Sequence, residues 1–129
     1  MTHKLVWAGL NDHLCHMSNI TNIAVSSIRA AGVRFAAHAE NIANANSTGY
    51  AALRPEQIST AAGPVVRVTR PDKSRPNAQQ GDNAPAPESD VDLTREFAQL
   101  IALKYDYKAS VKLLRTADEI SGTLLDVLA

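Results

Sequence analysis

The stretch ENIANANSTGY, residues 40–50, closes an alanine-rich run of helical sequence. Three asparagines, Asn41, Asn44 and Asn46, alternate with small apolar residues before Ser-Thr-Gly-Tyr. Asparagine side chains can bond the backbone groups that a helix end leaves free. Gly49 can adopt the positive φ that ends a helix or reverses the chain. The stretch therefore predicts a helix end near residue 46.

Asn41 and Asn44 are three residues apart and project from one side of the predicted helix. One interpretation is a capped helix end whose remaining amides face water. The other is that both amides bond across a subunit interface, where a buried amide fixes the register of packed helices. The residue pattern leaves both interpretations open.

Residues 18–46, which lead up to this end, have helical periodicity. One row of residues seven apart is Ile28, Phe35 and Ile42, and the neighbouring row is Ala24, Ala31, His38 and Ala45. Such rows are typical of helices that pack along a seam, as in coiled coils. We therefore expect an N-terminal assembly helix over residues 18–46, with His38 as a packing residue.

Residues 1–17 are expected to form a separate, disordered extension. Their apolar patch, Leu5 to Leu10, is broken by Asn11 and Asp12 before it reaches the length of a signal-peptide core. His13, Cys15 and His16 lie close together but lack a second ligand pair at zinc-binding spacing. We expect no metal and no cofactor.

Residues 47–90 differ in composition from both flanking regions, because they hold all six prolines of the chain. The polar string AQQGDNAPAPESD predicts an exposed, extended connection without its own core. Within it, residues 56–60 and 64–68 favour one short β-hairpin around Ala61-Ala62-Gly63.

Helical periodicity returns over residues 91–129, the expected C-terminal assembly helix. Its rows are Leu93, Leu100, Tyr107 and Leu114, and Phe97, Lys104, Val111, Asp118 and Leu125. Ser89 or Asp90 is expected to cap its start, with Asp92 in the first turn. The predicted fold is mainly α: two long terminal helices form a coiled-coil-like hairpin, joined by the Pro-rich extended segment.

Two polar side chains, Lys104 and Asp118, interrupt the second row. Burying either one alone would cost stability. Either each meets an opposite charge or an amide on a neighbouring subunit, or the row turns outward there and both face solvent. Both alternatives stand at the level of sequence.

Composition excludes several classes of function. The chain has 129 residues, a net charge of +0 and 5% aromatic residues. It therefore has no basic footprint for nucleic acid and a thin core for a globular enzyme. No nucleophile–base set or phosphate loop is recognisable, so we expect no enzyme and no small-molecule substrate.

Apolar residues also lie off the predicted rows of the C-terminal helix. They are Ile101, Leu103, Leu113, Ile120 and Leu124. A pair of helices buries one stripe on each, so apolar surface on further faces indicates assembly with other subunits.

Two motifs resemble one family. NIANANSTGY is similar to the N-terminal signature of the bacterial flagellar axial proteins, the rod and hook family. YKASVKLLRTADEISGTLL, residues 107–125, is similar to their C-terminal helix, especially at Thr116 to Glu119. The stretch that begins at Met17 resembles a natural family start, so residues 1–16 are expected to be an extension.

The resemblance implies that the terminal helices form the packed core of a hollow helical assembly. It implies an assembly signature of Asn41, Asn44, Asn46, Gly49 and Tyr50, and a small proximal rod subunit because the segment between the helices is short. The implied location is the periplasmic rod of the basal body. The implied partners are copies of the chain, other rod subunits and the flagellar type III export apparatus, which it would pass without a cleaved signal. The alternative is a helical-hairpin adaptor or export chaperone for axial proteins.

Overall fold

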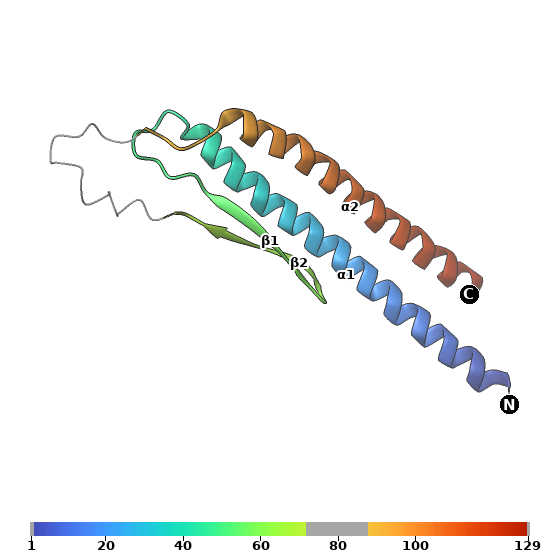
Figure 1. The fold of residues 1–129 in the computed structure, drawn as a ribbon. Coiled ribbons are helices and arrows are strands. Elements are labelled where there is room, and N and C mark those ends of the chain that lie inside the picture. Colours follow the sequence, from blue (N-terminus) through green and yellow to red (C-terminus); the bar gives the residue numbers. More distant parts are fainter. Residues whose placement is uncertain (1, 72–87, 129) are drawn as a thin grey trace.

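The computed structural model describes the backbone of residues 2–71 and 88–128 and the side chains of residues 18–71 and 88–126 (Figure 1). The elements are α1 (Thr2–Ala43), β1 (Arg54–Thr60), β2 (Gly63–Thr69) and α2 (Leu93–Leu128). The prediction of a mainly α chain with a short β-hairpin is confirmed. The core of the predicted Pro-rich connection, residues 72–87, lies outside the described residues.

Helix α1 differs from its predicted bounds at both ends. It begins at Thr2 and not at residue 18, so the expected disordered extension is helical here. Residues 2–17 contain one glycine and no proline, so nothing in them breaks a helix that runs on from residue 18. The helix ends at Ala43, before the predicted 46, and the Asn44 side-chain Nδ2 donates to the Glu40 carbonyl of its last turn at 2.9 Å.

Helix α1 is the central element of the fold. Figure 1 shows α2 running antiparallel along one side of α1 and the hairpin lying along another, and α1 contacts both. The N-terminal end of α1 extends past the C-terminal end of α2 (Figure 1). Coiled-coil-like packing of the two helices stays a prediction.

The hairpin is antiparallel and longer than predicted, with pairs from Arg54↔Thr69 to Thr60↔Gly63. Ala61 and Ala62 form the turn with negative φ, and Gly63 follows with a φ of 108°. A Cβ on Gly63 would overlap the Ser26 Oγ of α1. Only glycine therefore lets the tip of the hairpin lie directly on the helix.

The core is narrow and consists mostly of alanine. Its buried apolar residues are Ala24, Ala30, Ala31, Ala37, Ala51, Ala52, Leu103 and Ala117. Leu103 is 2% exposed and is the large apolar side chain at its centre. Small side chains let the backbones of helices approach closely, so this core buries little area for its length.

The buried row of α2 is one residue away from a predicted row. It contains Glu96, Leu103 and Ala117. The predicted row of Phe97, Lys104, Asp118 and Leu125 is exposed, and Val111 of that row is half-buried. A shift of one residue turns the buried face of the helix by about 100°. The hydrophobic pattern did not indicate the true buried row, because Glu96 and Ala117 add little hydrophobicity to it.

The residues of the other predicted rows differ in burial within the single chain, and their role as assembly seams stays a prediction. Ala24, Ala31 and His38 of α1 are buried, whereas Phe35 is 57% exposed. Ile28, Ile42, Leu100 and Leu114 are half-buried, and Leu93 and Tyr107 are exposed. Lys104 and Asp118 face solvent in the single chain, which leaves open whether a neighbouring subunit contacts them.

Candidate functional site

Asn41 lies at the point where α1, α2 and the returning chain meet, and it is 0% exposed. Its Nδ2 donates to the Leu53 carbonyl at 2.9 Å and to Glu96 Oε1 at 3.1 Å. Its Oδ1 accepts from the Leu53 backbone N–H at 2.7 Å and from the Tyr50 hydroxyl at 3.2 Å. Both donors and both acceptor positions of the amide are thus used within the chain.

Glu96 of α2 joins Asn41 to a second residue of α1. Its Oε2 lies 2.5 Å from Nδ1 of His38, and both side chains are buried. A carboxylate oxygen accepts, so the His38 Nδ1–H donates. We call His38, Asn41, Tyr50, Leu53 and Glu96 the clamp, because their bonds tie both helices to the segment after α1.

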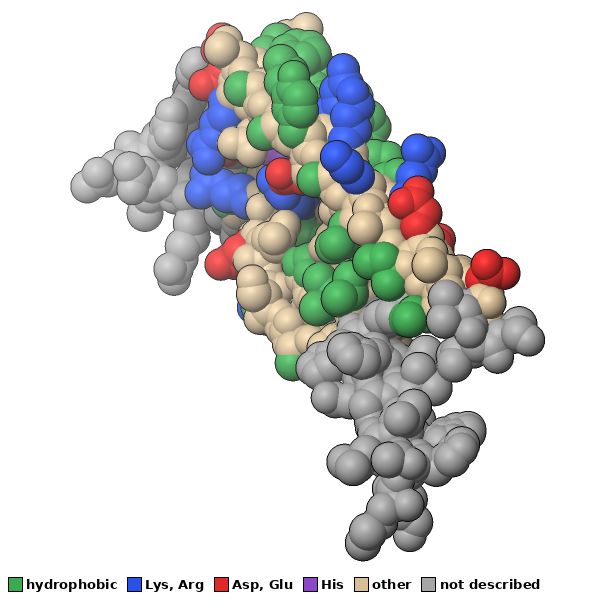
Figure 2. Space-filling view, turned by 90° about the vertical axis from the view of Figure 1, so that its right-hand side faces the viewer, with side chains coloured by type: hydrophobic (Ala, Val, Ile, Leu, Met, Phe, Trp, Pro, Cys, Tyr) green, Lys and Arg blue, Asp and Glu red, His purple; other side chains and the backbone are tan. Residues whose placement is uncertain are grey.

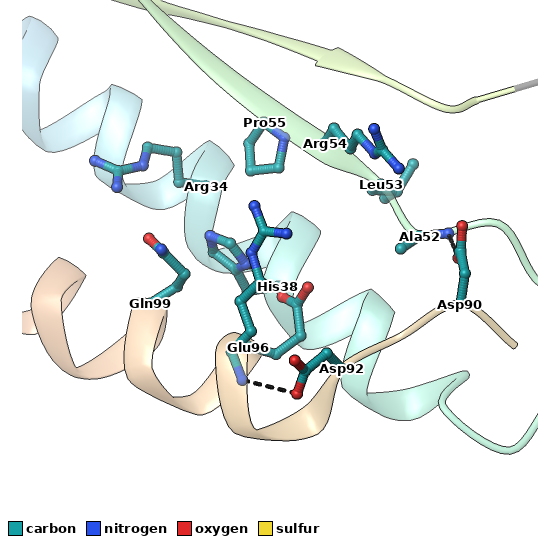
Figure 3. Close-up of a pocket in the computed structure, with 11 residues that line it drawn as sticks. Arg34, His38, Ala52, Leu53, Arg54, Pro55, Asp90, Asp92, Glu96 and Gln99 are labelled. Atoms are coloured by element: carbon teal, nitrogen blue, oxygen red, sulfur yellow. Dashed lines mark hydrogen bonds and ion pairs between the residues drawn. The ribbon is translucent and has the colours of Figure 1, made fainter.

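A polar pocket of about 290 Å³ lies beside the clamp (Figure 3). Figure 3 shows Arg34 and His38 of α1 and Glu96 and Gln99 of α2 around it, with Ala52 to Pro55 above. Among the side chains that the structure describes, no group of three His, Cys, Asp or Glu could hold a metal ion. The acid and the imidazole here are bonded to each other, which suits a structural tie between helices.

Two aspartates just before α2, Asp90 and Asp92, make different hydrogen bonds. Asp90 Oδ1 accepts from the Ala52 N–H at 2.6 Å, which ties the start of α2 to the segment after α1. Asp92 Oδ1 accepts from the Arg95 N–H at 3.1 Å and is the N-cap. The prediction that Ser89 or Asp90 caps the helix is therefore wrong, since the helix begins three residues after Asp90, at Leu93.

Tyr50 connects the clamp to the surface. The Arg70 guanidinium carbon lies 5.1 Å from the centre of its ring, and Arg70 also pairs with Glu40 at 2.7 Å. Burial raises the pKa of the Tyr50 phenol above its ordinary value, and the negative charge of Glu40 raises it further, against the lowering effect of Arg70. The phenol therefore holds its proton and keeps donating to Asn41.

Exposed large apolar side chains cover much of both helices. They are Ile20, Val33 and Phe35 on α1, and Leu93, Phe97, Ile101, Tyr105, Tyr107, Leu113, Ile120 and Leu125 on α2. Figure 2 shows hydrophobic side chains gathered in more than one place on the face it draws. An apolar groove between the helices is lined by Ala31, Gly32, Phe35, Leu100, Leu103, Lys104 and Tyr107. Contiguous apolar surface of this kind marks an interaction site.

Comparison with known families adds a direct finding. Residues 88–127 match the family model described as flagellar basal body rod FlgEFG protein, C-terminal. This match supports a relationship of the chain to the flagellar rod and hook family. The match covers α2 up to residue 127 and the five residues before the helix, and it includes Thr116 and Asp118. A comparison with curated proteins found no match.

The family match supports a structural, axial role at the flagellar basal body, in assembly with other rod subunits. The family is structural rather than enzymatic. Among the residues that the structure describes, no helix is long and apolar enough to cross a membrane. The matched model serves FlgE, FlgF and FlgG alike, so it singles out no position in the rod.

The predicted assembly signature lies outside the matched residues, and its role in assembly stays a prediction. The structure brings Asn41 and Tyr50 together in the clamp, and Gly49 has a φ of 73° as expected. Asn44 is the cap of α1, whereas Asn46 is exposed. Neither interpretation of the asparagines predicted that the Asn41 amide would use all of its hydrogen bonds within the chain.

Sequence reasoning missed Glu96 and Leu53, and it assigned Asp90 to the helix cap and not to the bond with the Ala52 N–H. The sequence held one indication that Glu96 is buried: it lies seven residues before Leu103, on the row that is buried in the structure. Leu53 takes part through its backbone, for which side-chain identity gives no signal.

Proposed function

We propose that this protein is a structural subunit of the flagellar basal-body rod, of the small proximal type. Its terminal helices pack against neighbouring subunits and build the axial shaft that transmits torque. The observation that carries the proposal is that α2, the element that matches the rod family, leaves most of its large apolar side chains exposed.

The outward side of α2 gives the proposal its physical basis. Phe97, Ile101 and Tyr105 follow one another at intervals of four residues, so they form one continuous stripe. All three are exposed, Phe97 to 52%. Covering such a stripe contributes about 25 cal/mol for each Å² of apolar surface removed from water. Neighbouring subunits in the rod are the surfaces proposed to cover it.

The clamp supports a mechanical role. Asn41 and Glu96 tie α1, α2 and the Leu53 backbone together at one end of the helix pair. A buried polar network with every member bonded is rigid and favours one arrangement. A subunit with its helices fixed in this way would transmit force without sliding of one helix along the other.

Other parts of the proposal follow from the family. The partners are rod subunits and copies of the chain itself, and the location is the periplasmic rod. Export through the flagellar type III apparatus without a cleaved signal is part of the same proposal. The short hairpin between the helices supports the small proximal type, because it is the only described structure between α1 and α2.

The test of the proposed rod function substitutes polar residues for two apolar residues of the stripe on α2. A tagged Phe97→Ser/Ile101→Ser variant, expressed in a strain that lacks the native chain, should be absent from purified basal bodies and should stop filament growth. The control is Val65→Ser, an exposed apolar residue on β2, which should be incorporated normally. Absence of the wild-type chain from basal bodies, together with a discrete dimer bound to exported axial proteins, would replace the rod function with the adaptor or chaperone.

A further inference from the structure

Most of the charge in the middle and last parts of α2 is segregated. Four cations, Lys104, Lys108, Lys112 and Arg115, lie in its middle part, and three anions, Asp118, Glu119 and Asp126, lie in its last part. The one anion within the middle part, Asp106, pairs with Arg34 of α1. All seven side chains are exposed, and none makes an ion pair with another described side chain. The basic part also holds a locally unfavourable arrangement, because Lys104 and Lys108, and Lys108 and Lys112, are like charges at i and i+4.

The basic part of one α2 helix is complementary to the acidic part of another when the two are offset by a fixed number of residues. Lys104 and Asp118 are 14 positions apart, as are Lys112 and Asp126. The same spacing relates the half-buried Val111 to Leu125, which is 67% exposed. A spacing of 14 is two heptads, so the paired residues lie close to one face of the helix. Along the right-hand edge of Figure 2, basic side chains lie above acidic ones.

We infer that the face of α2 beside the apolar groove binds the same face of a second, parallel copy displaced by two heptads, with Lys104 against Asp118 and Lys112 against Asp126. This contact rests on the proposed rod function and names the surface and the partner for it. At ~1.5 Å per residue the displacement is about 21 Å. The last turns of the neighbour's α2 then cover the groove that Phe35, Leu100 and Tyr107 line.

The displacement decides what kind of assembly forms. A parallel contact with an axial shift does not close on itself, so each copy adds another and a filament results. The antiparallel register that would pair Lys104 with Asp126 and Lys112 with Asp118 sets Arg115 against Arg115 of the other copy. Like charges placed opposite each other disfavour that register.

Charge reversal tests the register. Sedimentation velocity of the full chain at low ionic strength should show concentration-dependent self-association that salt weakens. Lys104→Glu alone should weaken it about fivefold, since it replaces an attraction with a repulsion. The double variant Lys104→Glu/Asp118→Lys should regain wild-type association. The mismatched double variant Lys104→Glu/Asp126→Lys has the same net charge and should associate more weakly than the single variant.

Three results would overturn the inference: a wild-type chain that stays monomeric, equal association of the matched and mismatched variants, or rescue by Asp126→Lys in place of Asp118→Lys. Arg67→Glu on β2 is the control for a general charge effect and should associate as the wild type does. Helix content by circular dichroism shows that each variant is folded. Basal-body incorporation is scored separately: a Lys104→Glu chain that associates weakly yet enters basal bodies normally contradicts this contact and leaves the rod function standing.

Discussion

At the scale of single residues, the fold depends on polar atoms at least as much as on apolar ones. Asn41 is the largest fully buried side chain among the described residues, and its amide bonds to the segment after α1 and to α2. A buried polar group that loses its partner costs the full penalty of its desolvation. The alanine core supplies little area to offset such a loss.

Asn41→Ala should therefore lower the free energy of unfolding by about 3 kcal/mol, because it leaves the Leu53 N–H and a carboxylate oxygen of Glu96 without partners. Chemical denaturation of the purified chain measures the change. Asn44→Ala is the matched control, because its amide bonds only the Glu40 carbonyl and the Ser47 hydroxyl within one turn. That variant should lose less than about 1 kcal/mol. Equal losses for the two would contradict the importance assigned to the clamp.

Tyr50 gives the clamp a dependence on pH. Its pKa in the folded chain is raised above the ordinary value of 10.0, first by burial and then by Glu40. The folded chain thus binds this proton more tightly than the unfolded chain does. The resulting stability is present below pH 10.0 and is lost as the pH rises through the folded pKa.

In an alkaline titration followed by phenolate absorbance, one of the three tyrosines should therefore ionise late. Tyr50→Phe should remove the late component, whereas Tyr105→Phe should leave it in place. A late component that survives in Tyr50→Phe would show that the raised pKa belongs to another residue.

At the scale of elements, the hairpin and α1 depend on one glycine contact. Gly63 combines a φ of 108° with a position where a Cβ would meet Ser26 and lie 3.2 Å from the backbone Cα of Ile23. Gly32 is the opposite case, since a Cβ there meets nothing within 4 Å and the residue lies inside α1. The two glycines therefore predict opposite effects of the same substitution.

Gly63→Ala should destabilise the chain by about 3 kcal/mol, through backbone strain and displacement of the hairpin from α1. Gly32→Ala should stabilise it by roughly 1 kcal/mol, because alanine is the better helix former. Thermal unfolding measures both. A Gly63→Ala variant as stable as the wild type would mean that the hairpin does not depend on this contact.

The elements also show where sequence reasoning works. Proline and glycine placement, together with the alternating PVVRV stretch, was sufficient to predict the hairpin, because turn residues act locally. The buried row of α2 was not predictable in the same way. Alanine and a paired glutamate occupy it, and whether Glu96 is buried depends on His38 and Asn41, which lie more than fifty positions away in the sequence.

At the scale of the whole molecule, α1 packs between α2 and the hairpin, whereas α2 packs against α1 alone among the described elements. Helix α1 contacts α2 and both strands, and Arg34 of α1 bonds to Gln57 of β1 at 3.2 Å and to Asp106 of α2 at 3.3 Å. Helix α2 is therefore the element with the most apolar surface left uncovered. The sequence predicted an excess of apolar surface on α2, but it assigned the exposed Phe97 and Leu125 to the buried seam and placed Leu103, which is 2% exposed, outside it.

The most direct measurement compares position 97 in the isolated chain and in the assembled basal body. A Cys15→Ser/Phe97→Cys variant, with Cys15→Ser/Arg67→Cys as the control on β2, is treated with a thiol reagent in both states. We expect the thiol at position 97 to react rapidly in the isolated chain, where Phe97 is 52% exposed, and to be protected in purified basal bodies. Equal reactivity of this position in both states, or absence of the chain from basal bodies, would contradict a rod subunit whose α2 is covered by its neighbours.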